Sequence, residues 1–78
     1  MYYVYILKCN DSGYYIGCTS DLKERIKRHL AGHVFSTSGR LPVALVHYAA
    51  FGEKYKAFEY ERYLKGGSGR AFMNKRLI

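Results

Sequence analysis

The chain contains no tryptophan, a single proline, two cysteines and only six acidic residues among 78. No apolar run approaches the roughly 18 residues that a membrane-spanning helix needs, so we expect no membrane segment. The first ten residues lack a basic leader and a long apolar centre, which predicts a cytoplasmic protein without a signal peptide. Cys9 and Cys18 are too few and too widely spaced for a disulfide framework or a zinc site, so we expect both to be reduced.

The scarcity of acidic residues leaves a strong positive balance. Thirteen Lys and Arg residues oppose six Asp and Glu residues, which gives a net charge of +7 and a pI near 9.6. Such a charge favours a polyanionic partner, because neutralising phosphates provides affinity without sequence preference. A basic protein that associates only with RNA would carry the same charge, so the balance alone is modest evidence for DNA. The length fits one domain over residues 1–78.

Tyrosine is unusually abundant, with nine residues in the chain, and we expect most of them in strands and in the core. Residues 2–8 and 14–18 are aromatic and β-branched and flank the turn cluster 10–13, which predicts a β-hairpin. Residues 43–51 predict a third strand that is apolar on both faces. Alternation along the hairpin puts two sets of residues on opposite faces: Tyr3, Tyr5, Leu7, Tyr15 and Gly17 on one, and Val4, Ile6, Tyr14 and Ile16 on the other.

The segment after the hairpin has the pattern of an amphipathic helix. Asp21 is suited to cap it, with Glu24 three residues later as the reciprocal partner in a capping box. Leu22, Ile26 and Leu30 recur at helical spacing and predict the buried stripe of this helix.

Two more helices are predicted nearer the carboxyl end. Residues 53–65 form the longer one, which two glycines end, and Ser68 is suited to cap a short third helix. Residues 33–40 are predicted to be a polar loop. The expected order is β-β-α-β-α-α, an α+β fold in which helices flank a small three-stranded antiparallel sheet.

Glu61 is the most informative single residue. It shares the core-facing stripe of its predicted helix with Ala57, Tyr60 and Leu64, whereas Glu59 points elsewhere and is interpreted as a solvated charge. A carboxylate at a core-facing position is costly unless a cation or several donors meet it. The pattern alone leaves two interpretations open: an ion pair with Arg25, or a metal ligand or catalytic acid.

Other candidate residues also have both a structural and a chemical interpretation. Arg25 borders an apolar stripe, where a guanidinium either extends to solvent or binds a phosphate. His29 is one turn further on; by itself it is more often an ordinary surface histidine than a proton carrier. The hydroxyls of Tyr5 and Tyr15 could orient a nucleophile, and Gly17 leaves space on their face of the hairpin.

These separate residues form a recognisable pattern. Val-Tyr-Ile at residues 4–6, followed about ten residues later by Tyr-Ile-Gly at residues 15–17, resembles the paired tripeptides that name the GIY-YIG endonuclease family. Residues 15–29 resemble the second strand and first helix of that family, with Arg25 at the position of its essential arginine. Glu61 lies where the family has its metal-binding glutamate. The resemblance covers nearly the whole chain; it is greatest to the short standalone members and extends to the amino-terminal nuclease domain of the ABC excinuclease of excision repair.

The resemblance implies a GIY-YIG fold and a metal-dependent DNA endonuclease. Glu61 would hold one Mg²⁺ or Mn²⁺ ion, with no small-molecule cofactor. Arg25 would stabilise the charge that grows on the scissile phosphate. Tyr15, or with less support His29, would help to deprotonate the attacking water, while Tyr5 positions it.

The expected partner is DNA, recognised by its structure in repair or recombination, and a protein partner is a further candidate source of specificity. A non-cleaving nucleic-acid-binding module with the same fold is the main alternative, and a structural RNA-associated protein is the third. Six basic residues are candidate contacts to the nucleic-acid backbone: Lys23, Lys27, Arg28, Arg40, Arg70 and Lys75.

Overall fold

The computed structural model describes residues 1–78 and contains a three-stranded antiparallel sheet in the order β2-β1-β3. β1 spans Tyr2–Lys8, β2 spans Tyr14–Thr19 and β3 spans Ala44–Phe51. Aromatic and β-branched side chains suit the half-buried, pleated surface that these segments form. The hairpin and the third strand are therefore confirmed, as is the α+β class.

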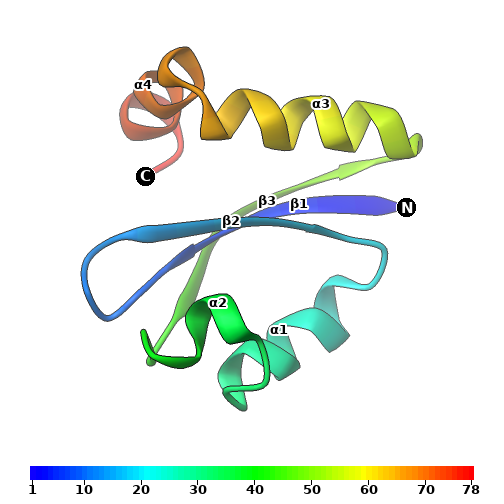
Figure 1. The fold of residues 1–78 in the computed structure, drawn as a ribbon. Coiled ribbons are helices and arrows are strands. Elements are labelled where there is room, and N and C mark those ends of the chain that lie inside the picture. Colours follow the sequence, from blue (N-terminus) through cyan, green and yellow to red (C-terminus); the bar gives the residue numbers. More distant parts are fainter.

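Four helices complete the fold, and they cover both faces of the sheet. Helices α1 and α2 lie on one face, and α3 and α4 lie on the other (Figure 1). No helix is both long enough and apolar enough to cross a membrane. The helices have these bounds: α1 Leu22–Leu30, α2 Phe35–Ser38, α3 Lys54–Lys65 and α4 Gly67–Arg76.

A tight turn joins the two strands of the hairpin. Asp11 Oδ1 accepts a hydrogen bond from the Gly13 N–H at 2.9 Å, the usual way in which an aspartate closes a turn. Both carboxylate oxygens of Asp11 also accept bonds from the Arg40 guanidinium, at 2.7 Å and 3.1 Å. This fork ties the turn to the segment before β3, so Arg40 has a structural partner within the chain.

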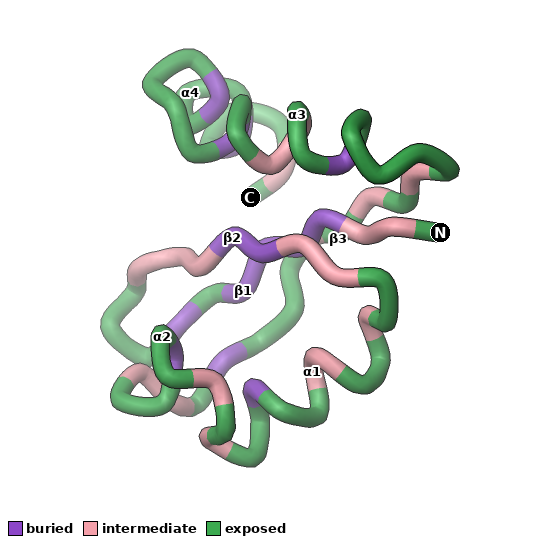
Figure 2. The backbone as a smooth tube through the Cα atoms, turned by 45° about the vertical axis from the view of Figure 1, so that its right-hand side comes forward, coloured by how far each residue is buried: buried purple, intermediate pink, exposed green.

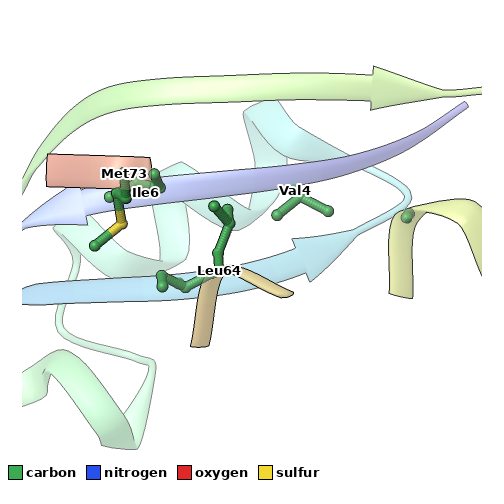
Figure 3. Close-up of a cluster of buried hydrophobic side chains, with 6 residues drawn as sticks. Val4, Ile6, Leu64 and Met73 are labelled. Atoms are coloured by element: carbon green, nitrogen blue, oxygen red, sulfur yellow. The ribbon is translucent and has the colours of Figure 1, made fainter. Parts of the chain in front are cut away.

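The sheet separates two apolar clusters, and burial is concentrated along its strands (Figure 2). The first cluster lies between the sheet and α3 with α4, where Leu64 and Met73 pack over Val4 and Ile6 (Figure 3). The second cluster lies on the α1 face and contains Tyr5, Leu7, Cys9 and Val43. Alternate residues of β1 thus belong to different cores, as the hairpin alternation predicted.

The start of α1 confirms one predicted cap and corrects another. Asp21 Oδ1 accepts a hydrogen bond from the Glu24 N–H at 3.1 Å, so Asp21 is the N-cap. The reciprocal half of the capping box is wrong, because the Asp21 N–H donates instead to Thr19 Oγ1 at 3.1 Å. The prediction that Leu30 is buried is also wrong: 57% of it is exposed, and it lines an open groove between α1 and β3.

The predicted loop at residues 33–40 contains the short helix α2. The Thr37 N–H donates to the Val34 carbonyl at 3.0 Å, and the Thr37 side chain is fully buried against the α1 side of the sheet. A threonine that faces the interior can hold such a turn in place although the local sequence is polar. The observed order is therefore β-β-α-α-β-α-α, with one helix more than predicted.

The last helix also begins differently from the prediction. Its N-cap is Gly66, without a side-chain hydrogen bond, and Ser68 lies inside the helix rather than capping it. Gly69 is packed so closely against the Tyr63 carbonyl of α3 that a β-carbon would overlap it. This close approach of α4 to α3 sets the start of the helix and leaves Ser68 exposed.

Candidate active site

The centre of the candidate site is the pairing of Tyr5 with Gly17. These residues are directly opposite each other on β1 and on the edge strand β2. The Tyr5 side chain is fully buried, and a β-carbon on Gly17 would overlap its hydroxyl and ring. The glycine therefore lets the phenol extend across β2, so that its hydroxyl lies on the α1 side of this edge strand.

A buried histidine accompanies this hydroxyl. The Tyr5 hydroxyl lies 2.8 Å from Nε2 of His29, and the other ring nitrogen, Nδ1, lies 2.8 Å from Thr37 Oγ1. All three residues have no exposed surface. A side chain that is more often found at the surface is thus the central member of a buried hydrogen-bonded chain, which favours the chemical interpretation of His29 over the structural one.

The surroundings hold both groups in their neutral forms at neutral pH. Burial, followed by the proximity of Tyr15, raises the pKa of Tyr5 to about 12, although the nearby Arg25 guanidinium opposes the rise. Burial, followed by the charges of Arg25 and Arg28, lowers the pKa of His29 below its ordinary value. The imidazole is therefore a free proton acceptor beside a protonated phenol.

Tyr15 and Arg25 complete the α1 side of the site. The Tyr15 ring centre is 5.1 Å from that of His29 and 6.2 Å from that of Tyr5, so the three rings form one cluster. Arg25 lies one turn before His29 on α1 and is half-buried. Its charge reaches the thiol of Cys18 as well as Tyr5, which places it near the edge strand.

Glu61 approaches the same edge from the other face of the sheet. Its side chain on α3 is 22% exposed, and Oε2 accepts an ion-paired hydrogen bond from Lys65 Nζ at 3.1 Å. The prediction of an ion pair with Arg25 is therefore wrong, because a lysine one turn along the same helix provides the cation. Together with burial, the Glu61 charge raises the pKa of Cys18, and it also contributes to the raised pKa of Tyr5.

Two adjoining hollows lie along this side of the molecule. One, of about 300 Å³, is bordered by Arg25, Cys18 and Lys54, and the other, of about 430 Å³, is bordered by Glu61 and Lys65. Phe58 of α3 borders both. The guanidinium and the carboxylate thus border neighbouring parts of one open surface, with the edge strand between them.

The donor set suits a hard divalent ion and excludes a zinc-type centre. No group of three His, Cys, Asp or Glu side chains is arranged to hold a metal, and both cysteines are free thiols. Magnesium is commonly held by one or two carboxylates, with water and substrate phosphate as the other ligands. Glu61 alone fits that pattern once Lys65 moves aside.

The basic residues are spread over two helices. Lys23, Lys27 and Arg28 are exposed on α1, while Arg70 and Lys75 are exposed on α4. The sequence interpretation missed three residues: Thr37, Lys54 and Lys65. The spacing of Lys65 four residues after Glu61 could have indicated the ion pair, whereas Thr37 lies in a segment with no helical periodicity.

The chain is similar to known proteins over almost its entire length. Residues 1–76 match the GIY-YIG catalytic domain. A UPF0213 protein of Clostridium perfringens is 47% identical over 66 residues, which cover 83% of this chain and 71% of that protein. A UPF0213 protein of Haloquadratum walsbyi is 40% identical over 65 residues, which cover 82% of this chain and 73% of that protein.

A solved structure agrees with the fold as well as the sequence. The solution NMR structure of the UPF0213 protein BH0048 from Bacillus halodurans is 41% identical, covers 95% of this chain and 81% of that one, and has a TM-score of 0.60. The tripeptides, the arginine and the glutamate thus occur in a chain that shares both the sequence pattern and the architecture of these short proteins. The chain belongs to the GIY-YIG family of nuclease domains.

Proposed function

We propose that this chain is a divalent-metal-dependent endonuclease that hydrolyses phosphodiester bonds in branched or damaged DNA, with a cytoplasmic role in repair or recombination. The single observation that carries the proposal is the grouping of Tyr5, Tyr15, Arg25 and His29 on the α1 side of β2, with the Glu61 charge reaching the same edge from α3. A binding protein has no need of a buried phenol–imidazole pair.

The first chemical task is to remove a proton from the attacking water. Tyr5 has a pKa of about 12, so a free phenolate at pH 7 would cost about 7 kcal/mol. That cost is too high for a stored phenolate. We therefore assign a concerted transfer, in which the Tyr5 oxygen takes the water proton while its own proton passes to Nε2 of His29.

The second task is to stabilise the charge that develops on the phosphate. Arg25 has a planar set of donors that matches two phosphate oxygens, and its half-buried position strengthens such a contact. Glu61 would hold Mg²⁺ or Mn²⁺, which supplies Lewis-acid stabilisation of the phosphate and the leaving oxygen. Tyr15 packs against His29 and Tyr5 and keeps the two rings in place.

Binding of DNA rests on the positive surface. The net charge of +7 and the exposed lysines of α1 suit contacts with the phosphate backbone. Contacts to phosphate carry no sequence information, so specificity would come from DNA structure or from a protein partner.

The test is incubation of the purified protein with plain, flapped and branched duplexes, each with EDTA, Mg²⁺ or Mn²⁺. Metal-dependent nicking that Tyr5→Phe and Arg25→Ala abolish, with folding retained by circular dichroism, supports the proposal. Tight DNA binding without any nicking would identify the chain as a non-cleaving module instead.

A further inference from the structure

The buried chain of hydrogen bonds beneath the site extends beyond the two groups used above. Thr37 Oγ1 lies 2.8 Å from His29 Nδ1 and 3.4 Å from the carbonyl of Val34, toward which its hydroxyl donates. Nothing in the comparisons assigns Thr37 a role. It comes from α2, the helix absent from the sequence interpretation, and it has no exposed surface.

The number of protons along this chain fixes their direction. The Thr37 hydroxyl has one proton, and a carbonyl can only accept, so that proton points to Val34. The Thr37 oxygen is then an acceptor for His29, which requires the proton of the neutral ring to be on Nδ1. Nε2 is consequently bare and accepts the hydrogen bond of the Tyr5 hydroxyl.

The other end of the chain leads independently to the same tautomer. The Arg25 guanidinium is close enough to act on the Tyr5 hydroxyl, and a guanidinium can only donate. If Nε2 of His29 also carried a proton, the Tyr5 oxygen would face two donors, and neither could accept its own proton. No buried side-chain polar atom lacks a partner in this structure, in agreement with the arrangement in which Tyr5 donates to His29.

We infer that Thr37 is a positioning residue: it fixes His29 in the tautomer that carries its proton on Nδ1, so that Nε2 is ready to receive the proton of Tyr5. The consequence for catalysis rests on the proposed function, whereas the tautomer itself does not. After the transfer, the imidazolium donates from Nε2 to the Tyr5 oxygen and from Nδ1 to Thr37. No heavy atom has to move, and the two N–H groups of the charged ring both have acceptors.

The direct test is nitrogen NMR of the histidine side chains in the full chain at pH 7.5, with His29→Gln used to assign the signals. We expect Nδ1 of His29 to be protonated and Nε2 to be bare. A ring protonated on Nε2 would overturn the inference. This measurement needs no variant of Thr37, so it holds even if such a variant fails to fold.

A pair of variants then separates positioning from packing. Thr37→Val keeps the shape but removes the acceptor, whereas Thr37→Ser keeps the hydroxyl and loses a methyl group. We expect Thr37→Val to mix the two tautomers of His29 and to slow nicking by roughly 10- to 100-fold with a changed pH profile, and Thr37→Ser to retain the wild-type tautomer. Equal tautomer populations in wild type and Thr37→Val would overturn the inference. The expected tautomer in a protein that nicks no DNA would overturn the proposed function alone.

Discussion

The Tyr5 hydroxyl lies across Gly17 of the neighbouring strand, where a β-carbon of residue 17 would otherwise be. The two residues belong to the two tripeptides of the family pattern, and the contact gives a physical reason for the glycine. It keeps the edge strand open, so that a phenol rooted in the central strand reaches the α1 side of β2. Any side chain at position 17 would displace the hydroxyl from His29.

Gly17→Ala is therefore expected to lower the free energy of unfolding by about 1–3 kcal/mol, because the new methyl group must displace a buried ring. Urea denaturation at pH 7.5 measures the change. Gly52→Ala is the matched control, since nothing lies within 4 Å of a β-carbon there, and it should stay within about 0.5 kcal/mol of wild type. Equal stability of both variants would contradict the packing of Tyr5 over Gly17.

His29 should make stability depend on pH. Its pKa in the folded chain lies below the ordinary value of 6.5, because of burial and the charges of Arg25 and Arg28; the polar groups of Tyr5 and Thr37 face it from the sheet and α2. Below pH 6.5 the unfolded chain binds the proton more readily, so the stabilising contribution is present above that value and is lost as the pH falls through the folded pKa. We expect the unfolding free energy to decline by up to about 1.4 kcal/mol per pH unit per histidine between pH 6.5 and 5.

His47 provides the control for that measurement, because burial lowers its pKa as well. Urea titrations of His29→Gln and His47→Gln should each remove one share of the slope, whereas only His29→Gln should abolish nicking. The nicking rate of the wild type should fall over the same pH range, since a protonated Nε2 cannot receive the Tyr5 proton. An unchanged slope in His29→Gln would show that this histidine is not held in the neutral form.

The Glu61–Lys65 ion pair should compete with the divalent ion. Lys65→Met removes the 3.1 Å contact, so Glu61 becomes available, and the Mn²⁺ concentration that half-saturates the protein should fall by roughly two- to fivefold. Electron paramagnetic resonance of free Mn²⁺ measures binding without DNA. Lys75→Met, an exposed lysine on α4, should leave the midpoint unchanged. The competition is excluded if both variants bind Mn²⁺ like wild type.

The basic residues should divide into two classes in a salt titration of DNA binding. Lys27→Gln removes an exposed charge and should reduce the salt slope by about one unit. Arg40→Gln should leave the slope nearly unchanged and should lower thermal stability instead, because Arg40 is held by Asp11. A full unit of slope lost in Arg40→Gln, with stability retained, would mean that the arginine leaves Asp11 to bind phosphate.

The strands, the two longer helices and the opposing faces of the hairpin were predictable from sequence, because alternation and helical spacing are local patterns. Helix α2 was not, since its four residues are too few to show a period and Thr37 is held by His29 from another helix. The position of Glu61 on an inward stripe was predictable, but its partner Lys65 and the second ring contact of His29 depend on side-chain placement. The catalytic assignments of Tyr5, Tyr15, Arg25, His29 and Glu61 remain predictions.

The most direct test of the account compares two carboxylates on one helix. Glu61→Gln should abolish Mg²⁺-dependent nicking of branched DNA and weaken Mn²⁺ binding, while Glu59→Gln, an exposed neighbour with no partner in the site, should do neither. Both variants should unfold at the wild-type urea concentration. Full nicking by folded Glu61→Gln, or equal loss in both variants, would contradict the claim that Glu61 holds the metal for phosphodiester cleavage.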